Sequence, residues 1–350
     1  MQDLTTVFTR AKVQVEGPRK GEAMAAGNKV TLEQIAAHFG VSKTTVSRAL
    51  SGKGRVSAAR REEIRRYAEE AGYPVESGPP VPENICVVLP DNLLDDSIFF
   101  QTCLAGILDA LQKYRCNTMI VLERGNRTDR LSEALTRMRC DGVILLQNYI
   151  DDQQMRYLRN IGMPFVLGGT SSDPDVYQVD GNVYQAADVM TTHLIEKGSK
   201  RIAFVGGMEH YLVNRDRCAG YLRALQDHLM PQRNDLVFRN ITTAEDAGNA
   251  ADLMLSRGAD AAIASDDILS SLLLQALTER GVYVPSEFRI GSLYDSTYTQ
   301  TAYPPISSMS IPTRKMGAAL SEKLAALVRG EDPERITNID YRLLERRSSD

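Results

Sequence analysis

From Ile85 onward, short runs of consecutive apolar residues alternate with longer stretches in which apolar residues recur every three or four positions. The runs are typical of strands buried on both faces of a parallel sheet, and the longer stretches are typical of amphipathic helices. The predicted strands are ICVVLP, TMIVLE, GVILLQ and PFVLG, followed by RIAFVG, AAIAS and RIGSLY. The predicted helices span about 99–114, 128–139, 152–161, 183–197, 214–229, 245–257 and 267–281.

Repeated strand-helix units imply right-handed crossovers and a doubly wound α/β sheet. Because the units fall into two similar series, we expect two lobes with a cleft between them. Ligands of such sheets bind at the carboxyl ends of the strands. The residues that follow the predicted strands are therefore the first place to look for a binding site.

The stretch Val30–Leu50 has a different pattern, that of two short helices joined by a tight turn. Thr31 is placed to cap the first helix, Gly40 to end it, and Ser42 to cap the second. Ala36, a small residue four positions before Gly40, and the branched residue Val46 allow the two helices to cross closely. This arrangement predicts a helix-turn-helix motif, although a simple helical hairpin with one polar face has the same pattern.

Charge favours the DNA-binding interpretation of this segment. Ser57 is placed to cap a third helix that ends near Gly72, which completes a three-helix headpiece. The segment from Asn28 to Tyr73 contains nine Lys or Arg and five Asp or Glu, so it carries +4, against a net charge of −4 for the whole chain. A basic module on an acidic body is expected when only one end of a protein faces phosphates.

Composition excludes several other classes of protein. No apolar run approaches the ~20 residues that span a bilayer, and the first residues lack the apolar block of a signal peptide, so we expect a cytoplasmic protein without a membrane partner. The five cysteines are widely spaced and lie mostly in apolar runs, which predicts reduced core residues without a metal site. Glycine loops and nucleophile motifs typical of cofactor-dependent or hydrolytic enzymes do not occur, so neither a cofactor nor catalysis is expected.

Polar residues at the ends of the predicted strands are the candidates for ligand binding. They are Asn148, Arg215, Arg217, Asp266 and Asp295, with Phe99 and Phe100 as a possible apolar platform. Carboxylates accept hydroxyl protons and guanidinium groups donate them, so this set suits a hydroxyl-rich or ionised small molecule. Asp266 could equally serve only as a helix N-cap, and the two phenylalanines could equally be core residues.

Both the predicted headpiece and the predicted two-lobed body contribute to a family resemblance. The sequence from Val30 to Ser348 resembles the LacI/GalR family of bacterial transcriptional regulators. The stretches that carry the resemblance include VTLEQIAAHFGVSKTTVSRAL, GRVSAARREEIRRYAEEAGY, IFFQTCLAGI, VDGNVYQAADVMTTHLIEKGSKRIAFVGG, RDRCAGY, SDD at 265–267, YDS at 294–296, PPISSMSIPTRKMG and LLERRSS. The resemblance implies a periplasmic-binding-protein-like body. It also implies a homodimer that binds double-stranded operator DNA of near-palindromic sequence.

The resemblance also assigns roles to individual residues. The second helix reads the major groove through Lys43, Thr44 and Arg48, while Thr31 and Ser47 lie near phosphates, and Ser42 completes the predicted DNA-binding set. In the cleft, Arg217 and Asp295 take the positions of the family's ligand-binding arginine and aspartate. Asp266, Phe99 and Phe100 fall on pocket positions, and Arg215 completes the predicted ligand-binding set.

Three departures from the family pattern stand out. The segment 76–84 is short and contains three prolines, so the usual hinge helix, with the leucine that wedges into the minor groove, is not available. The usual Gly-His before the strand at 201 is Gly198-Ser199, and no leucine-heptad tail follows Asp350. The first departure leaves a rival hypothesis open, a small-molecule sensor with weakened or altered DNA binding.

The sequence therefore predicts a ligand-responsive transcriptional regulator, a repressor that senses a sugar or sugar acid. The expected domains are a disordered extension at 1–28, the headpiece at 29–75, a proline-rich linker at 76–84, and the body at 85–350. Within the body we expect lobe 1 at about 85–182 and 306–329, and lobe 2 at about 183–305 and 330–347.

Overall fold

The computed structural model describes residues 30–50, 56–73, 82–91, 98–147 and 149–350. The chain divides into two compact units, residues 1–78 and residues 79–350. The predicted N-terminal extension, most of the proline-rich linker, and Asn148 lie outside the described residues. None of the described helices combines the length and the apolar character that a membrane span requires.

The first unit contains three helices, α1 (Leu32–Phe39), α2 (Lys43–Leu50) and α3 (Ala58–Glu70). The predicted caps are confirmed: the hydroxyl of Thr31 accepts from the Gln34 amide at 3.4 Å, and that of Ser42 accepts from the Thr45 amide at 3.1 Å. Gly40 ends α1 with φ at 63°, a left-handed conformation that favours glycine. The three helices enclose a small core of Ile35, Ala36, Val46, Ala49, Ile64 and Ala68.

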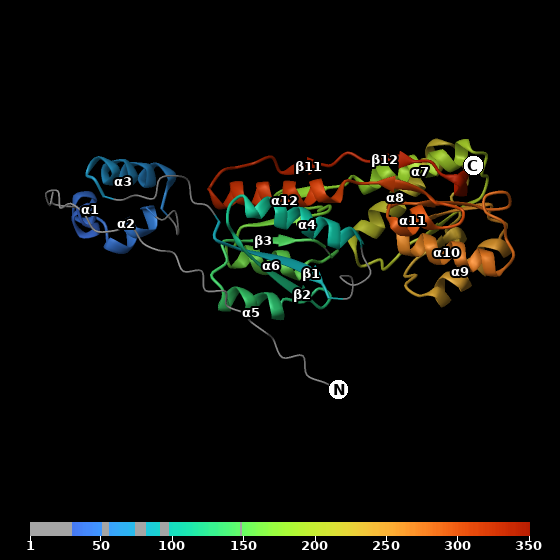
Figure 1. The fold of residues 1–350 in the computed structure, drawn as a ribbon, viewed down its shortest axis with the longest axis horizontal. Helices are drawn as coiled ribbons and strands as arrows, with labels where there is room; N and C mark the ends of the chain where they lie inside the picture. Colours follow the sequence, from blue (N-terminus) through green and yellow to red (C-terminus); the bar gives the residue numbers. More distant parts are fainter. Residues whose placement is uncertain (1–29, 51–55, 74–81, 92–97, 148) are drawn as a thin grey trace, which may run out of the picture. The chain divides into compact units, whose positions relative to one another are not determined.

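Lobe 1 of the second unit is a six-stranded parallel sheet in the order β11-β5-β4-β3-β1-β2 (Figure 1). Its strands are β1 (Asn84–Pro90), β2 (Asn117–Glu123), β3 (Gly142–Leu145), β4 (Phe165–Gly168), β5 (Gln178–Asp180) and β11 (Ile336–Asn338). Its helices are α4 (Ile98–Gln112), α5 (Asp129–Arg137), α6 (Gln153–Asn160) and α12 (Thr313–Val328). Residues of α4 and α12 cover one face of the sheet and residues of α5 and α6 cover the other, so alternate residues of β1 enter opposite cores.

Lobe 2 is a second six-stranded sheet, in the order β12-β10-β9-β8-β6-β7. Its strands are β6 (Ile202–Val205), β7 (Val237–Phe238), β8 (Ala261–Ala264), β9 (Arg289–Ser292), β10 (Ser307–Ser310) and the antiparallel β12 (Arg342–Leu344). Its helices are α7 (Val183–Glu196), α8 (Leu212–Asp227), α9 (Ala244–Ser256), α10 (Asp267–Glu279) and α11 (Thr297–Thr301). Residues of α7 and α8 pack on one face, and residues of α9 and α10 pack on the other.

The predicted lobe boundaries near the C-terminus are wrong in two places. Strand β10 pairs with β9 in lobe 2, although 306–329 was assigned to lobe 1. Strand β11 pairs with β5 in lobe 1, although 330–347 was assigned to lobe 2. The chain thus passes between the lobes after β5, after β10 and again after β11, and the short strands β11 and β12 complete an edge of one sheet each.

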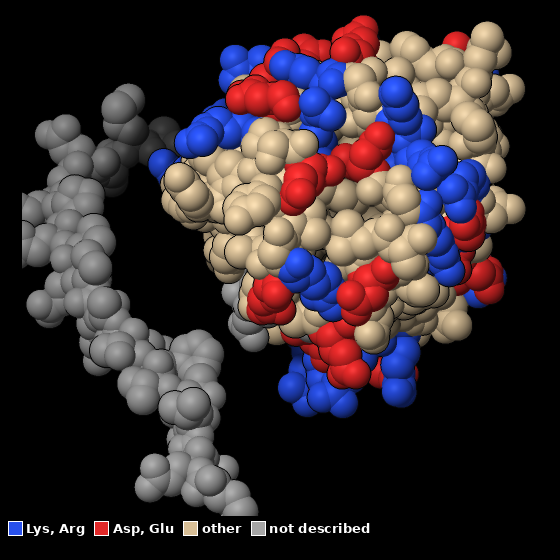
Figure 2. All heavy atoms as spheres, turned by 90° about the vertical axis from the view of Figure 1, so that its right-hand side faces the viewer, with Lys and Arg blue, Asp and Glu red and all other residues tan. Residues whose placement is uncertain are grey.

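The end of lobe 2 carries charges of both signs, interspersed among uncharged residues (Figure 2). Many charged residues of this lobe form ion pairs on its surface, such as Arg223 with Asp227 and Arg280 with Asp252. A face of mixed charge lacks the basic stripe that phosphate backbones require. The end of lobe 2 is therefore not a candidate for DNA binding.

Two glycines allow α4 and α12 to cross closely in lobe 1. A Cβ at Gly106 would lie 2.1 Å from the carbonyl oxygen of Arg314, and one at Gly317 would lie 2.1 Å from that of Cys103. Since the obstacles are backbone atoms, no change of rotamer relieves the contact. We expect Gly106→Ala to lower the free energy of unfolding by about 1–3 kcal/mol, measured by urea denaturation.

Gly248→Ala in α9 is the matched control for this prediction. Its added Cβ meets only the side-chain end of Arg280, at 3.3 Å, so a shift of that guanidinium group by a few tenths of an ångström relieves the contact. Alanine is also a better helix former than glycine, so this variant is expected to be neutral or slightly stabilised. Equal destabilisation of the two variants would contradict the proposed close crossing.

Candidate functional site

The predicted DNA-reading residues share one exposed surface of the headpiece. Thr31 lies at the start of α1, and the others lie at the start of α2 or on its outer side: Ser42, Lys43, Thr44, Ser47 and Arg48. Val46 and Ala49 of the same helix are buried in the headpiece core. The amphipathic pattern of α2 thus leaves a polar face whose N-terminal half is free to approach base edges.

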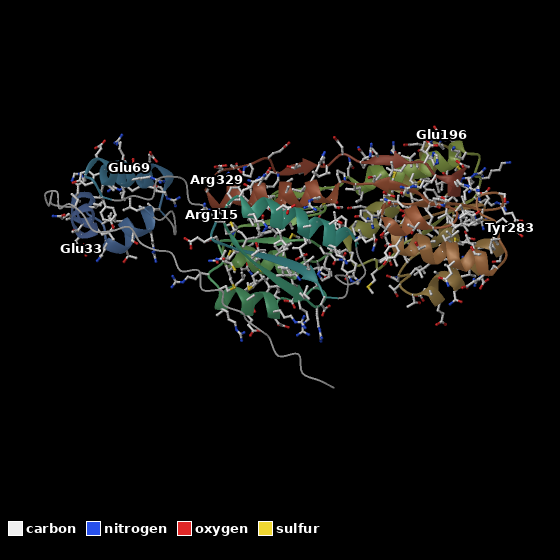
Figure 3. All side chains as sticks on the ribbon, viewed as in Figure 1. Glu33, Glu69, Arg115, Glu196, Tyr283 and Arg329 are labelled. Carbon is white, nitrogen blue, oxygen red and sulfur yellow. The ribbon has the colours of Figure 1, made fainter. Side chains whose placement is uncertain are left out.

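Lys43 and Arg48 differ in their surroundings on this surface. Lys43 forms an ion pair with Glu33 of α1, a residue labelled in Figure 3. The hydrogen bond between them raises the pKa of Lys43 and lowers that of Glu33. Exposed pairs of this kind contribute little stability, so DNA phosphates or bases can replace Glu33 as the partner. Arg48 forms no ion pair with any described residue, and its guanidinium group is available for a ligand.

The two lobes enclose a cleft of about 390 Å³. It lies at the carboxyl ends of the strands, where parallel sheets place their ligands. Lobe 1 contributes Phe99, Phe100, Gln147, Thr170 and Asp180 to its lining, and lobe 2 contributes Tyr211, Asn214, Arg217, Asp266, Asp267 and Tyr294. The cleft therefore combines apolar rings with a few polar groups, the usual composition of a small-molecule site.

Three lining residues have a buried polar atom without a hydrogen-bond partner among the described residues. These atoms are Arg217 Nε, Asp267 Oδ2 and Gln147 Oε1. Buried polar groups are almost always satisfied in folded proteins, so a group of exceptions in one cleft calls for a ligand or water. Together they offer one donor and two acceptors.

Electrostatics in the cleft are dominated by burial. Burial lowers the pKa of Arg217, and the neighbouring carboxylates of Asp266, Asp267 and Asp180 oppose that shift. Burial raises the pKa of Asp267, and burial together with the charge of Asp216 raises that of Asp180. The lining thus contains three carboxyl groups around one guanidinium group.

Asp266 is a helix N-cap and also lies in the lining of the cleft, so the cap does not exclude the predicted role in ligand binding. One carboxylate oxygen accepts from the Leu269 amide at 2.8 Å and caps α10, and the residue also lines the cleft. Phe99 and Phe100 likewise line the cleft while packing against the lobe 1 core, and the Phe99 ring meets Tyr294 edge-on at 5.7 Å. For these residues the two alternatives were not exclusive.

Two predicted ligand residues do not line the cleft. Arg215 is exposed on α8. Asp295 instead forms an ion pair with Arg346 at 2.7 Å and accepts from Ser308 at 2.6 Å. Arg346 lies on the C-terminal segment, far away in sequence, so the sequence did not predict this ion pair, and a role of Asp295 or Arg215 in ligand binding stays a prediction.

Asp267, Asp180, Gln147 and Asn214 line the cleft but were not predicted to do so. Asp267 is the first residue of α10 and follows the capping residue Asp266, and only Asp266 was predicted to lie in the cleft. Asp180 ends β5, a strand of three residues that is too short to show a hydrophobic run. Gln147 ends the predicted strand GVILLQ, which is the one signal that the sequence offered for it.

The ion pair of Asp295 makes a prediction about stability. The Asp295 side chain is 9% exposed and that of Arg346 is 18% exposed. Burial alone would raise the pKa of Asp295, but hydrogen bonds from Arg346 and Ser308 hold it below its usual value. We expect Asp295→Asn to lower the free energy of unfolding at pH 7 by about 3 kcal/mol, because it leaves Arg346 buried without a countercharge.

The pH dependence of this loss is a further check. A carboxyl group whose pKa is lowered by folding stabilises the protein above its unfolded pKa, and this contribution disappears as the pH falls through the folded pKa. The difference between the wild type and Asp295→Asn is therefore expected to shrink below about pH 4. Asp252→Asn, at an exposed pair, is the control, with an expected change under about 1 kcal/mol.

Comparison with known proteins identifies this architecture. Residues 31–74 match the family model for bacterial regulatory proteins of the lacI family, and residues 191–349 match that for the periplasmic binding protein-like domain. The chain is 30% identical over 326 residues to the HTH-type transcriptional regulator CelR of Thermobifida fusca, covering 89% of this chain and 95% of CelR. The chain belongs to the LacI family.

Solved structures agree with this assignment. A CelR-cellobiose complex has a TM-score of 0.71 and 30% sequence identity, with 91% of this chain and 99% of that chain covered. The transcription regulator CcpA of Lactococcus lactis has a TM-score of 0.70 and 28% identity, with 76% and 98% covered. This LacI-family protein is a DNA-binding transcriptional regulator, and its relatives are regulators and not enzymes.

Proposed function

We propose that this LacI-family regulator is a repressor that binds its operator as a homodimer and releases it when a neutral sugar enters the cleft. The observation that carries the proposal is the set of unpartnered buried atoms on Arg217, Asp267 and Gln147. Sugar hydroxyl groups both donate and accept, so they can satisfy all three atoms at once. The rings of Phe99 and Tyr294 supply apolar surface for the faces of a sugar ring.

The charge of the lining favours a neutral sugar over a sugar acid. Asp180, Asp266 and Asp267 line the cleft, and Arg217 is the one arginine or lysine among its described lining residues. A carboxylate ligand would add a fourth negative group to a buried site, and its repulsion would offset the attraction of Arg217. Hydroxyl groups carry no such cost.

The headpiece and the two lobes support the proposed homodimer and the proposed mode of control. One helix-turn-helix unit contacts one half-site, so a near-palindromic operator needs two chains. Three large tyrosines of lobe 2, Tyr283, Tyr298 and Tyr303, are 71%, 44% and 83% exposed, and Tyr283 points away from the lobe in Figure 3. A second chain that covers such rings would gain apolar burial. A sugar that favours one closure of the lobes would then change the spacing of the headpieces.

A thermal-shift screen of the full chain tests the proposal. Neutral disaccharides such as cellobiose and maltose are compared with galacturonate and gluconate. The effective sugar is expected to stabilise the folded body by about 2.7 kcal/mol at a hundred times its Kd, with a corresponding rise in Tm. A rise with sugar acids alone would contradict the neutral-sugar assignment.

A further inference from the structure

Beyond the three chain crossovers, the two lobes also meet through a short backbone contact. Tyr149, which follows β3 in lobe 1, forms an isolated antiparallel bridge with Tyr211, which precedes α8 in lobe 2. The amide of Ile150 donates to the carbonyl oxygen of His210 at 3.2 Å. This hydrogen bond joins one lobe to the other, so it is broken when the lobes separate at this point.

Three aromatic rings reinforce the contact. The rings of Tyr149 and His210 are nearly parallel, with an angle of 6° and centroids 5.8 Å apart. Tyr149 and Tyr211 lie 5.2 Å apart, and His210 and Tyr211 lie 4.2 Å apart. Tyr149 is 6% exposed and Tyr211 is 7% exposed, so separating the lobes would expose large apolar rings to water.

Each half of the contact is fixed within its own lobe. The Tyr149 amide donates to Asp152 at 3.0 Å, and Asp152 also accepts from the Met155 amide at 2.8 Å to cap α6. In lobe 2, the Asn214 amide donates to the Tyr211 carbonyl at 3.1 Å. Helix α8, which carries Arg217, is therefore held to the same segment as Tyr211 and His210.

We propose that Tyr149 and His210 are positioning residues, which with Tyr211 form a latch that stabilises the closed arrangement of the two lobes. Tyr211 and Asn214 line the cleft. Tyr149 lines a separate small cavity together with Gln147. Neither Tyr149 nor His210 is among the described residues that line the cleft, so we expect them to act by setting the separation of the residues that do. The link to effector response rests on the proposed function, whereas the latch itself does not.

Removing one ring of the latch is expected to change the equilibrium between the open and the closed arrangement of the two lobes. An aromatic pair contributes enough that its removal is expected to shift this balance about threefold to tenfold toward the open form. Effector affinity falls in proportion to the closed fraction, so it changes little while the closed form still predominates. Operator affinity without effector would change in parallel if only one form spaces the headpieces correctly.

Hydrogen exchange of the full chain, without any sugar, tests the latch. His210→Ala removes the ring but leaves the carbonyl group that accepts from Ile150. The Ile150 amide in the other lobe is expected to exchange about threefold to tenfold faster in this variant. Tyr149→Ala, which removes the other ring of the stacked pair, is expected to match His210→Ala.

His228→Ala is the control, because His228 is exposed at the end of α8, away from the latch. Unchanged exchange at Ile150 in both His210→Ala and Tyr149→Ala would overturn the proposal. The same variants are then titrated with cellobiose in the thermal-shift assay. If the Ile150 amide exchanges faster in the variants but cellobiose does not raise the Tm of the wild type, the latch is supported and the effector assignment is rejected. If cellobiose raises the Tm but the Ile150 amide exchanges at the wild-type rate in the variants, only the latch is rejected.

Discussion

An Arg48→Ala variant is expected to lose most of its preference for the operator over random DNA of the same length. Arg48 is exposed on α2, forms no ion pair with any described residue, and has the side chain best suited to the two acceptors of guanine. A good bidentate contact to a base discriminates by about 1–3 kcal/mol, and a dimer makes it in both half-sites. The combined loss is expected to remove most of the preference for the operator.

Fluorescence anisotropy over a range of salt concentrations measures this effect, with the upstream region of the regulator's own gene as the first operator to test. The matched control is Arg66→Ala, which removes an equally charged, exposed side chain from α3. It is expected to weaken binding to specific and random DNA alike, through the loss of one charge. If the wild type itself showed no preference for its upstream region, the rival hypothesis of a sensor with weakened DNA binding would replace the repressor.

An Arg217→Ala variant is expected to lose its response to the effector while it keeps its affinity for the operator. Arg217 has a buried Nε without a partner among the described residues, in a cleft with three carboxyl groups. Hydrogen bonds to charged groups contribute about 1.5–3 kcal/mol, so effector affinity is expected to fall about 10-fold to 150-fold. The sugar-induced rise in Tm and the sugar-induced release of operator DNA both report this loss.

Arg215→Ala provides a close control on the same helix. Arg215 lies two positions earlier on α8, is exposed, and does not line the cleft. Its removal changes the net charge by the same amount but is expected to leave the response intact. A loss of response in Arg215→Ala and not in Arg217→Ala would place the effector outside the cleft that we describe.

Local features of the sequence predicted much of this protein. Thr31 and Ser42 cap helices where their side chains were expected to do so, and α7 begins at Val183 as the apolar periodicity predicted. A cap depends on groups three residues away, and helical periodicity depends on groups three or four residues away. Such features are therefore visible in a short window of the chain, and the headpiece, the lobes and the position of the cleft follow from them.

Contacts between distant segments were decided only by the tertiary structure. Strands β5 (QVD), β10 (SSMS) and β11 (ITN) are short and largely polar, so they show no apolar run, and their hydrogen-bond partners determine the lobe to which each belongs. Asp295 and Asp267 both occur near the end of a strand, but only Asp295 meets Arg346, a partner 51 positions along the chain. Because an ion pair requires proximity in space, and such proximity is set by the packing of the whole lobe, the sequence alone could not tell which aspartate faces the cleft.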